Sequence, residues 1–371
     1  MKVKDYIDTY LKDFIEHIHN DFRWKYEDGC ILSGCEQLYK VTGEFFYKDI
    51  IKKYMDAYIK EDGTILTYDK ASYNIDNINP GKVLFFLYDE TRQEKYRRAI
   101  ESLMDQLREH PRTFCGNFWH KQIYPYQIWL DGLYMAQPFY LLYETRFHKN
   151  ENVNDTINQF LNVRTYLFDE GKRLYYHGYD EAKVQKWANK ETGKSPNFWL
   201  RAMGWYVMAL VDTIEIHTSS CTLKSTSLHN CLIELFIEAI EGLLQYQDKE
   251  SKMFYQLIDR ADIEENYLET SGSAMIAYSI LKGTNIQLLP KNYINIGNDI
   301  LNGIITEKLI TSENGRKLTG ICRVAGLGPV DARDGSTRYY FSEDIVSDDL
   351  KGVGAFIMAY AQSLQVKDNK N

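Results

Sequence analysis

Residues 131–136 read Asp131-Gly132-Leu133-Tyr134-Met135-Ala136, a polar and a small residue followed by an aromatic and apolar face. This pattern is typical of a helix that begins on a small residue and then packs against its neighbours. Small residues at one end of several helices let those helices approach closely at a shared centre. Similar patterns recur, widely spaced, at 34–39, 201–206, 271–275 and 352–356.

Helical periodicity extends over most of the rest of the chain. Apolar residues at i, i+3 and i+4 spacing predict one helical face between Tyr6 and Ile18. Only short β-runs are predicted, around 64–67, 173–177 and 253–257. Further helices are predicted over 32–59, 80–110, 127–147, 154–168, 196–217, 228–247, 270–283, 290–308 and 348–365.

The spacing of the repeats distinguishes two helical architectures. The repeats of a helical solenoid are usually about 30–45 residues long. The looser spacing here favours a closed ring of about six helical hairpins, an α/α toroid that forms a single domain over 1–371. In such a ring the loops at one end of the inner helices form a cleft, and the motifs described below fall at or just before predicted inner-helix starts.

Charge and composition exclude several classes of partner. The net charge is −8 and no basic stripe occurs, which argues against nucleic acid and against an anionic membrane surface. No run of about 18 apolar residues predicts a transmembrane helix, and charges interrupt the N-terminus, unlike a signal peptide. Six scattered cysteines without CxxC or zinc-like spacing predict reduced thiols in a cytoplasmic protein; they are Cys30, Cys35, Cys115, Cys221, Cys231 and Cys322.

The segment 118–132 gathers side chains suited to sugar binding and acid chemistry. His120 and Lys121 precede Tyr124 and Trp129, whose rings would form an aromatic wall for a sugar. Asp131 follows at the predicted helix start. One interpretation makes Asp131 a general acid whose pKa is raised by the flanking tryptophan. The other makes it a helix-capping aspartate beside core aromatics.

A polar run at 71–81 contains Asp76 and precedes an apolar helix. It has the composition of a helix-entry loop rich in Asn, Asp and Ser. Alternatively, Asp76 is the second carboxylate of a hydrolytic pair.

A third motif combines aromatic residues with a single arginine. His177-Gly178-Tyr179-Asp180-Glu181 is followed by Ser195 and Pro196, which resemble an N-cap and a first-turn proline. Trp199, Arg201 and Trp205 would then lie in the first turns of one inner helix. Arg201 would hold a sugar carboxylate or hydroxyl pair, or else pair with an internal acid as structural wiring.

The glycine-rich segment 320–328 lacks the spacing of a phosphate loop. We expect an irregular loop that lines the cleft, with Arg323 and Arg333 as rim cations. The sequence contains neither the Gly-x-Ser-x-Gly elbow of serine hydrolases nor His-Glu-x-x-His. No metal and no cofactor are expected.

Together these motifs resemble glycoside hydrolase family 105, the unsaturated rhamnogalacturonyl hydrolases. The resemblance covers nearly the whole chain, from Trp24 to Gly354, and implies an all-α (α/α)6 barrel. Its most specific parts are 129–135, 177–181, 199–205 and 333–336.

The resemblance also implies roles for individual residues. The family's catalytic Asp falls on Asp131 and its second active-site carboxylate on Asp76. Looser matches at Asp28, Gly29, Cys322 and Arg323 leave the roles of those residues open. Substrate-contacting positions fall on His120, Lys121, His177, Trp199, Arg201 and Trp205.

The implied substrate is an oligosaccharide left by a pectin lyase, ending in a uronic acid with a C4=C5 double bond. The implied reaction is hydration of that enol ether, in which Asp131 protonates C4 and its conjugate base helps water add at C5. This chemistry needs Asp131 protonated at the start.

Three alternatives remain open from the sequence. An unsaturated glucuronyl hydrolase would share the toroid and the hydration chemistry, but would act on lyase products of other polysaccharides such as glycosaminoglycans. An ordinary inverting glycosidase would need two carboxylates about 6.5–9.5 Å apart. A helical-repeat scaffold that binds a protein would expose a broad apolar concave face.

Overall fold

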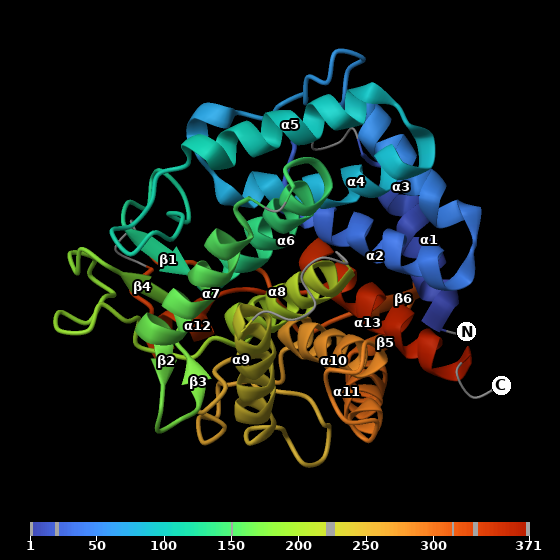
Figure 1. Ribbon diagram of the computed structural model, residues 1–371. Coiled ribbons are helices and arrows are strands. Elements are labelled where there is room, and N and C mark those ends of the chain that lie inside the picture. The colour runs from blue at the N-terminus through green and yellow to red at the C-terminus, as the bar shows by residue number, and fades with distance from the viewer. Residues whose placement is uncertain are drawn as a thin grey trace.

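The computed structural model describes residues 3–18, 22–149, 151–219, 227–313, 315–328 and 333–368. Within these ranges, long helices alternate along the chain between an outer and an inner ring (Figure 1). The outer helices are α1 (Val3–Glu16), α3 (Phe45–Tyr58), α5 (Glu94–Glu109), α7 (Val153–Leu167), α9 (Ser227–Leu244) and α11 (Tyr293–Glu307). The inner helices are α2 (Tyr26–Thr42), α4 (Lys82–Thr91), α6 (Leu130–Phe147), α8 (Leu200–Ser219), α10 (Thr270–Asn285) and α13 (Leu350–Asp368).

The inner helices pack side by side into a closed ring. Helix α6 packs on α8, α8 on α10, α10 on α13, and α13 on α2. The 3₁₀ helix η2 (Ile75–Gly81) and α4 complete the circuit between α2 and α6. The first helix packs against the last, since Tyr6 of α1 meets Phe356 of α13 edge to face. The all-α (α/α)6 barrel expected from the sequence is confirmed.

Inner helices are buried on every side, which explains their small residues. Nearly every position of α8 and α10 is buried. A Cβ on Gly204 of α8 would lie 2.8 Å from the Cβ of Met275 in α10, so glycine is what permits this approach. Helices that are apolar all round are typical of a protein interior.

Two of the expected helices are each broken into two. Within 32–59, Gly43 ends α2 in the left-handed conformation, with φ of 69°, and its N–H donates to the carbonyl of Tyr39. Within 80–110, Arg92 ends α4 in the same way, with φ of 56°. The pattern at 34–39 does not begin a helix, because α2 already begins at Tyr26. The predicted helix 127–147 opens with a three-residue strand.

Short β-ribbons join the helices at their ends. The expected run at 173–177 is confirmed in part as β3 (Leu174–Tyr175), which pairs with β2 (Phe168–Asp169). The runs at 64–67 and 253–257 form only isolated bridges. The other pairs are β1 (Gln127–Trp129) with β4 (Gly178–Asp180), β5 (Leu309–Ser312) with β6 (Gly315–Leu318), and β7 (Ile321–Cys322) with β8 (Ile345–Val346). Two shorter helices, η1 (Lys70–Ser72) and α12 (Thr337–Ser342), lie in the connections.

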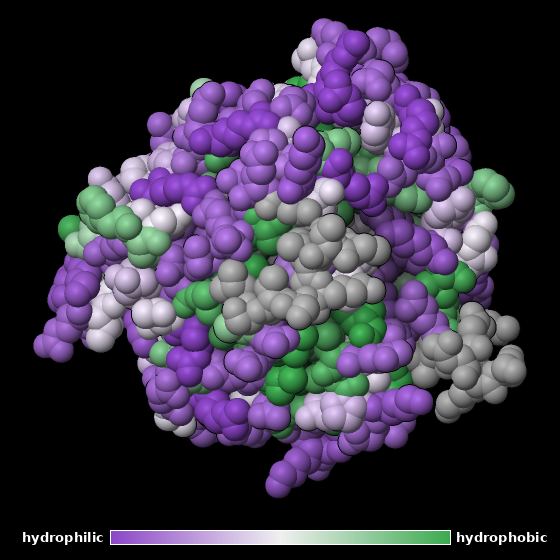
Figure 2. All heavy atoms as spheres, in the orientation of Figure 1, coloured by the Kyte–Doolittle hydropathy of each residue, from purple (hydrophilic) through white to green (hydrophobic). Residues whose placement is uncertain are grey.

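The inner helices all run in one direction, because each outer helix returns the chain antiparallel to the one before it. Their N-termini therefore gather at one end of the barrel and their C-termini at the other. Hydrophilic side chains cover much of the face shown in Figure 2. Among the helices described, none is long and apolar enough to cross a bilayer.

Replacing Gly354 tests this close packing. A Cβ at this position of α13 would lie 2.6 Å from the backbone carbonyl carbon of Cys30 in α2, and that backbone has little freedom to move. We expect Gly354→Ala to lower the free energy of unfolding by roughly 1–3 kcal/mol in urea titrations, despite the better helix propensity of alanine. The control Ser363→Ala, on the partly exposed side of α13, should stay within about 0.5 kcal/mol of the parent protein. Equal stability of both variants would contradict a tightly packed α2–α13 contact.

Candidate active site

The candidate site lies at the N-terminal end of the inner helices, and its position depends on the backbone of His120. The N–H of His120 donates to the carbonyl of Gln127 at 3.0 Å, and its carbonyl accepts from the N–H of Ile75 at 3.3 Å. These two bonds hold the loop that carries His120 between strand β1 and η2. The side chains that follow Ile75 and precede α6 are thereby drawn together.

Asp76 is the carboxylate of η2 beside this junction. The side chain of Asn74 caps η2 by accepting from the N–H of Asp76 at 3.1 Å. The Nζ of Lys121 lies 2.6 Å from Oδ2 of Asp76, and Nε2 of His120 lies 3.6 Å from its Oδ1. This carboxylate is 6% exposed, so the paired lysine offsets the cost of burying its charge. A cavity of about 270 Å³ adjoins Asp76 and Lys121.

Asp131 is the second residue of α6, and it faces His177. Pairing of β1 with β4 places Trp129 opposite Gly178, and the N–H of Leu130 donates to the carbonyl of His177 at 3.1 Å. As a result, Nε2 of His177 lies 3.5 Å from Oδ2 of Asp131. On its other side, Nδ1 of His177 lies 2.8 Å from the hydroxyl of Tyr340 in α12.

The expectation of a raised pKa for Asp131 is wrong for the free site. Burial raises the pKa of this carboxyl, but interaction with His177, and to a lesser extent with His120, lowers it below the ordinary value overall. At 3.5 Å the His177–Asp131 contact is longer than a well-formed hydrogen bond. Asp131 is therefore a carboxylate in the free protein. The tryptophan next to Asp131 in the sequence does not indicate this lowered pKa, because the cause is His177, which lies far from Asp131 along the chain.

His120 is the neutral member of an aromatic cluster. Its ring stacks on Trp129 with centroids 4.3 Å apart, and Tyr124 stacks on the same indole at 4.8 Å, with 6.2 Å between the His120 and Tyr124 rings. Burial lowers the pKa of His120 to about 4, so the imidazole is uncharged at neutral pH. Tyr124, Trp129 and His120 thus form a continuous flat surface beside both carboxylates.

Three buried polar atoms at this site lack hydrogen-bond partners among the described residues. They are Nδ1 of His120, Oδ2 of Asp131 and Nε2 of His177. Buried polar atoms are nearly always satisfied in folded proteins. Their concentration here is typical of a site that completes its hydrogen bonds with a polar ligand.

The residues of α8 are more buried than the sequence suggested. Trp199 lies beside His177, with ring centroids 4.7 Å apart, and it is within reach of the site. Arg201 is 1% exposed and directs its guanidinium to the protein itself, donating to the carbonyl of Cys322 and, at 3.2 Å, to Oγ of Ser271. Trp205 packs deeper still, stacked on Tyr134 at 4.8 Å. Arg201 is therefore held within the protein, but by carbonyl and hydroxyl oxygens rather than by the internal acid that the sequence left open as its partner.

The glycine-rich loop covers the aromatic stack. Leu327 packs in one apolar cluster with Tyr124, Trp129 and Trp187. Arg323 is exposed and forms an ion pair with Asp344 at 3.4 Å. The loop therefore lines the cleft as expected, while its first arginine already has a partner at the rim.

Three contributing residues were not anticipated from the sequence. Tyr340 holds His177, and Glu269 caps α10 while also accepting from the N–H of Cys322 at 3.1 Å. His110 supports the loop below His120, with Nε2 lying 2.9 Å from the carbonyl of Trp119. Only Tyr340 had a sequence signal, because it closely follows the motif at 333–336.

His110 gives a pH-dependent test of this support. Burial lowers the pKa of His110 to about 4, whereas an unfolded histidine titrates near 6.5. The unfolded chain therefore takes up a proton first as the pH falls, and folded stability is lost between about pH 6.5 and pH 4. We expect His110→Gln to reduce the stability lost between pH 7 and pH 5 by roughly 1–2 kcal/mol, measured by urea unfolding at each pH. An unchanged pH dependence would show that the pKa of His110 is not lowered in the folded protein.

Comparison with known proteins places this site in a family. The model of Glycosyl Hydrolase Family 88 matches residues 2–367. A 24.9 kDa protein in the picA locus of Rhizobium radiobacter is 39% identical over 237 residues, which is 62% of this chain and 98% of that protein. Unsaturated rhamnogalacturonyl hydrolase YesR of Bacillus subtilis is 27% identical over 290 residues, 76% of each chain.

Solved structures agree with this assignment. A family 105 glycoside hydrolase of C. acetobutylicum superposes with a TM-score of 0.90 and 44% identity, over 96% of this chain and 98% of that one. An unsaturated glucuronyl hydrolase from Bacillus sp. GL1 shares the fold, with a TM-score of 0.68 and 13% identity over 96% and 94% of the two chains. The chain therefore belongs to glycoside hydrolase family 88, and its solved relatives include a member of family 105.

Proposed function

We propose that this enzyme removes the 4,5-unsaturated galacturonyl residue from the non-reducing end of rhamnogalacturonan oligosaccharides by hydrating its C4=C5 bond. The observation that carries the proposal is the buried Asp131–His177 pair, which lies against an aromatic surface and has unsatisfied polar atoms. A single carboxylate that both gives and receives a proton suits hydration of an enol ether. The named activity of YesR supports the same class of substrate.

Asp131 must be protonated before it can transfer a proton to C4. In the free site burial raises the pKa of this carboxyl, but interaction with His177 lowers it overall. Binding of the substrate's own carboxylate nearby would raise the pKa of Asp131, because like charges disfavour ionisation. Asp131 then takes up a proton, which becomes available for transfer to the sugar.

The reaction then follows in balanced steps. The O–H of Asp131 protonates C4, the π electrons form the new C4–H bond, and C5 gains oxocarbenium character. Water adds to C5 as the Asp131 carboxylate takes its proton. The resulting hemiketal opens to a C5 ketone, and the free C1 hemiacetal releases the remaining saccharide. Asp131 thereby regains its proton, so that it can protonate C4 of the next substrate.

The Asp76–Lys121–His120 group has a binding role in this proposal. Lys121 holds Asp76 as a carboxylate, whose oxygens can accept from sugar hydroxyls or from the attacking water. Neutral His120 offers Nδ1 to the same ligand. Trp129, Tyr124 and Trp199 supply apolar faces for the sugar rings, as an extension of their observed stacking.

Asp131→Asn is the direct test of the chemistry. We expect turnover of an unsaturated disaccharide, followed by loss of enol-ether absorbance, to fall about a thousandfold or more, because an amide neither donates an acidic proton nor accepts one. Asp56→Asn is the matched control, since Asp56 lies on outer helix α3 and pairs with Lys95 away from the site. Turnover of Asp131→Asn near that of the control would exclude this mechanism.

A substrate panel separates the proposal from its alternatives. Unsaturated rhamnogalacturonan disaccharides should be hydrated faster than unsaturated glycosaminoglycan disaccharides, by about tenfold or more in kcat/KM, if pocket contacts select the sugar. The reverse order would favour an unsaturated glucuronyl hydrolase. Release of sugar from saturated oligosaccharides at a comparable rate would favour an inverting glycosidase.

A further inference from the structure

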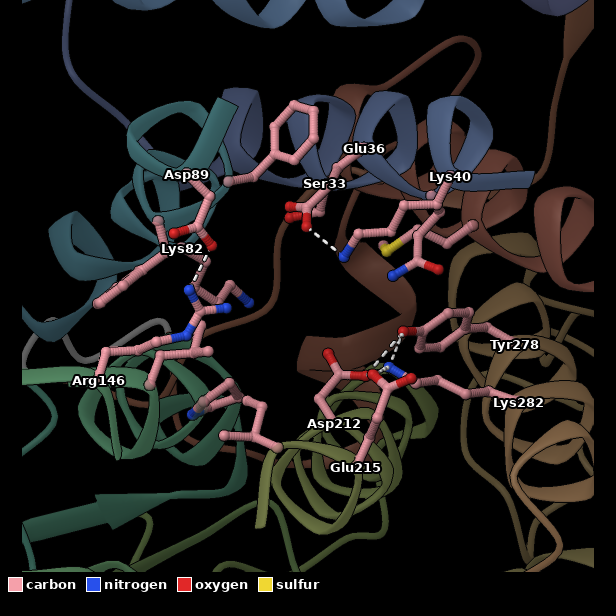
Figure 3. A pocket seen from close by; sticks show the side chains of 17 residues that line it. Ser33, Glu36, Lys40, Lys82, Asp89, Arg146, Asp212, Glu215, Tyr278 and Lys282 are labelled. Atoms are coloured by element: carbon pink, nitrogen blue, oxygen red, sulfur yellow. Dashed lines mark hydrogen bonds and ion pairs between the residues drawn. The ribbon is translucent and has the colours of Figure 1, made fainter. Parts of the chain in front are cut away.

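A second cavity, of about 200 Å³, lies at the end of the barrel opposite Asp131. All six inner helices contribute to its lining, mostly from their C-terminal halves. Figure 3 shows charged side chains gathered around its centre. None of them takes part in the chemistry proposed for Asp131. The principal charged groups are Glu36, Lys82, Asp89, Arg146, Asp212 and Lys282.

Most of these charges are paired across neighbouring helices. Arg146 of α6 pairs with Asp89 of α4. Lys282 of α10 lies 2.7 Å from Oδ1 of Asp212 and 2.7 Å from Oε2 of Glu215, both in α8. Dashed lines in Figure 3 mark these contacts on separate sides of the cavity. Lys282 thus pairs with two carboxylates. The side of the cavity formed by Asp212, Glu215 and Lys282 therefore carries an excess of negative charge.

The remaining cation is Lys82, which forms no ion pair with a carboxylate of the described residues, although the charge of Asp212 acts on it from farther away. It is 8% exposed, and its Nζ lies 3.3 Å from the ring centroid of Tyr134 and 3.4 Å from the Tyr134 carbonyl. Burial lowers the pKa of Lys82 to about 8, so it is still mostly protonated at neutral pH. A buried ammonium without a counter-ion is costly, and an anion in the cavity would remove that cost.

Helix dipoles account for the other cations but not for this one. Lys40, Arg146 and Lys282 lie in the last turns of α2, α6 and α10, where positive charge is favourable. Lys82 is the first residue of α4, where the helix dipole opposes a cation. The contact of its ammonium with the Tyr134 ring offsets part of this cost, and no ion pair among the described residues offsets the rest.

We propose that this cavity, lined by the inner helices and centred on Lys82, binds a small hydroxy-carboxylate of about the size of a monosaccharide acid. The ligand carboxylate would pair with Nζ of Lys82. Its hydroxyl groups would donate to Glu36, Asp212 and Glu215, each of which engages a lysine through one oxygen only among the described contacts.

The mixed charge of the lining selects this ligand class. A simple anion would meet Lys82 but would also face the carboxylates of the opposite side, with nothing to donate to them. A neutral sugar would satisfy those carboxylates and leave Lys82 without a counter-ion. The volume corresponds to about seven water-sized spaces, enough for a single sugar acid and too little for an oligosaccharide.

The test measures binding of D-galacturonate by calorimetry and by the shift in melting temperature, with galactose and inorganic phosphate as comparison probes. We expect galacturonate to bind the parent protein more tightly than either comparison probe. Lys82→Met, which keeps the side-chain volume and removes the charge, should weaken binding at least tenfold. Lys95→Met is the matched control, because Lys95 is equally buried at 8% exposure but lies on outer helix α5, where it pairs with Asp56 and Glu61.

A second variant tests the same cavity in case Lys82→Met does not fold. Ser33 lines the cavity from α2, and Ser33→Leu would fill part of it without changing a charge. Galacturonate bound at the Asp131 end would still bind in both variants. Only the binding that is lost in these variants is therefore assigned to this cavity. Full affinity in both variants would overturn the proposal. Galactose or phosphate binding as tightly as galacturonate would overturn the ligand class.

Discussion

The two backbone hydrogen bonds of His120 are the constraint on which the rest of the site depends. They tie a loop between α5 and α6 to strand β1 on one side and to η2 on the other. They add to the packing of η2 on α6 and hold Asp76 of η2 beside the start of the helix that carries Asp131. With them, His120 lies close enough to both carboxylates for each to raise the pKa of its imidazole.

Burial at this junction also sets the electrostatics. His120 is driven to the neutral form, Lys121 stays charged because Asp76 is beside it, and Asp131 stays ionised because His177 faces it. Two carboxylates thus have different partners within one site: Asp76 faces the ammonium of Lys121, and Asp131 faces the imidazole of His177. Imidazole is a side chain suited to proton exchange, which is the physical reason why we propose Asp131 for the chemistry.

The sequence predicted helices and their packing face well, because apolar periodicity depends on local spacing alone. It missed where two helices end. Gly43 is a recognisable C-cap glycine, but Arg92 adopts the same left-handed conformation without any special residue type. In the site, the expected neighbours Asp76, His120 and Lys121 do meet. The pairing of Asp131 with His177 and Tyr340 was beyond reach, because it joins β1, β4 and α12 from distant parts of the chain.

The same reasoning explains why the Arg201 motif was harder to interpret than the Asp131 motif. A tryptophan–arginine pair at a helix start has the residue types of a sugar-binding site, and Trp199 does lie beside His177. The guanidinium, however, is needed to satisfy the carbonyl of Cys322, where strand β7 crosses the end of α8. Glu269 accepts from the N–H of the same cysteine, so the backbone of Cys322 is held at its N–H and at its carbonyl by two buried side chains. Such a clamp fixes the start of the glycine-rich loop that covers Trp129, and Arg201 thereby shapes the cleft from beneath its surface.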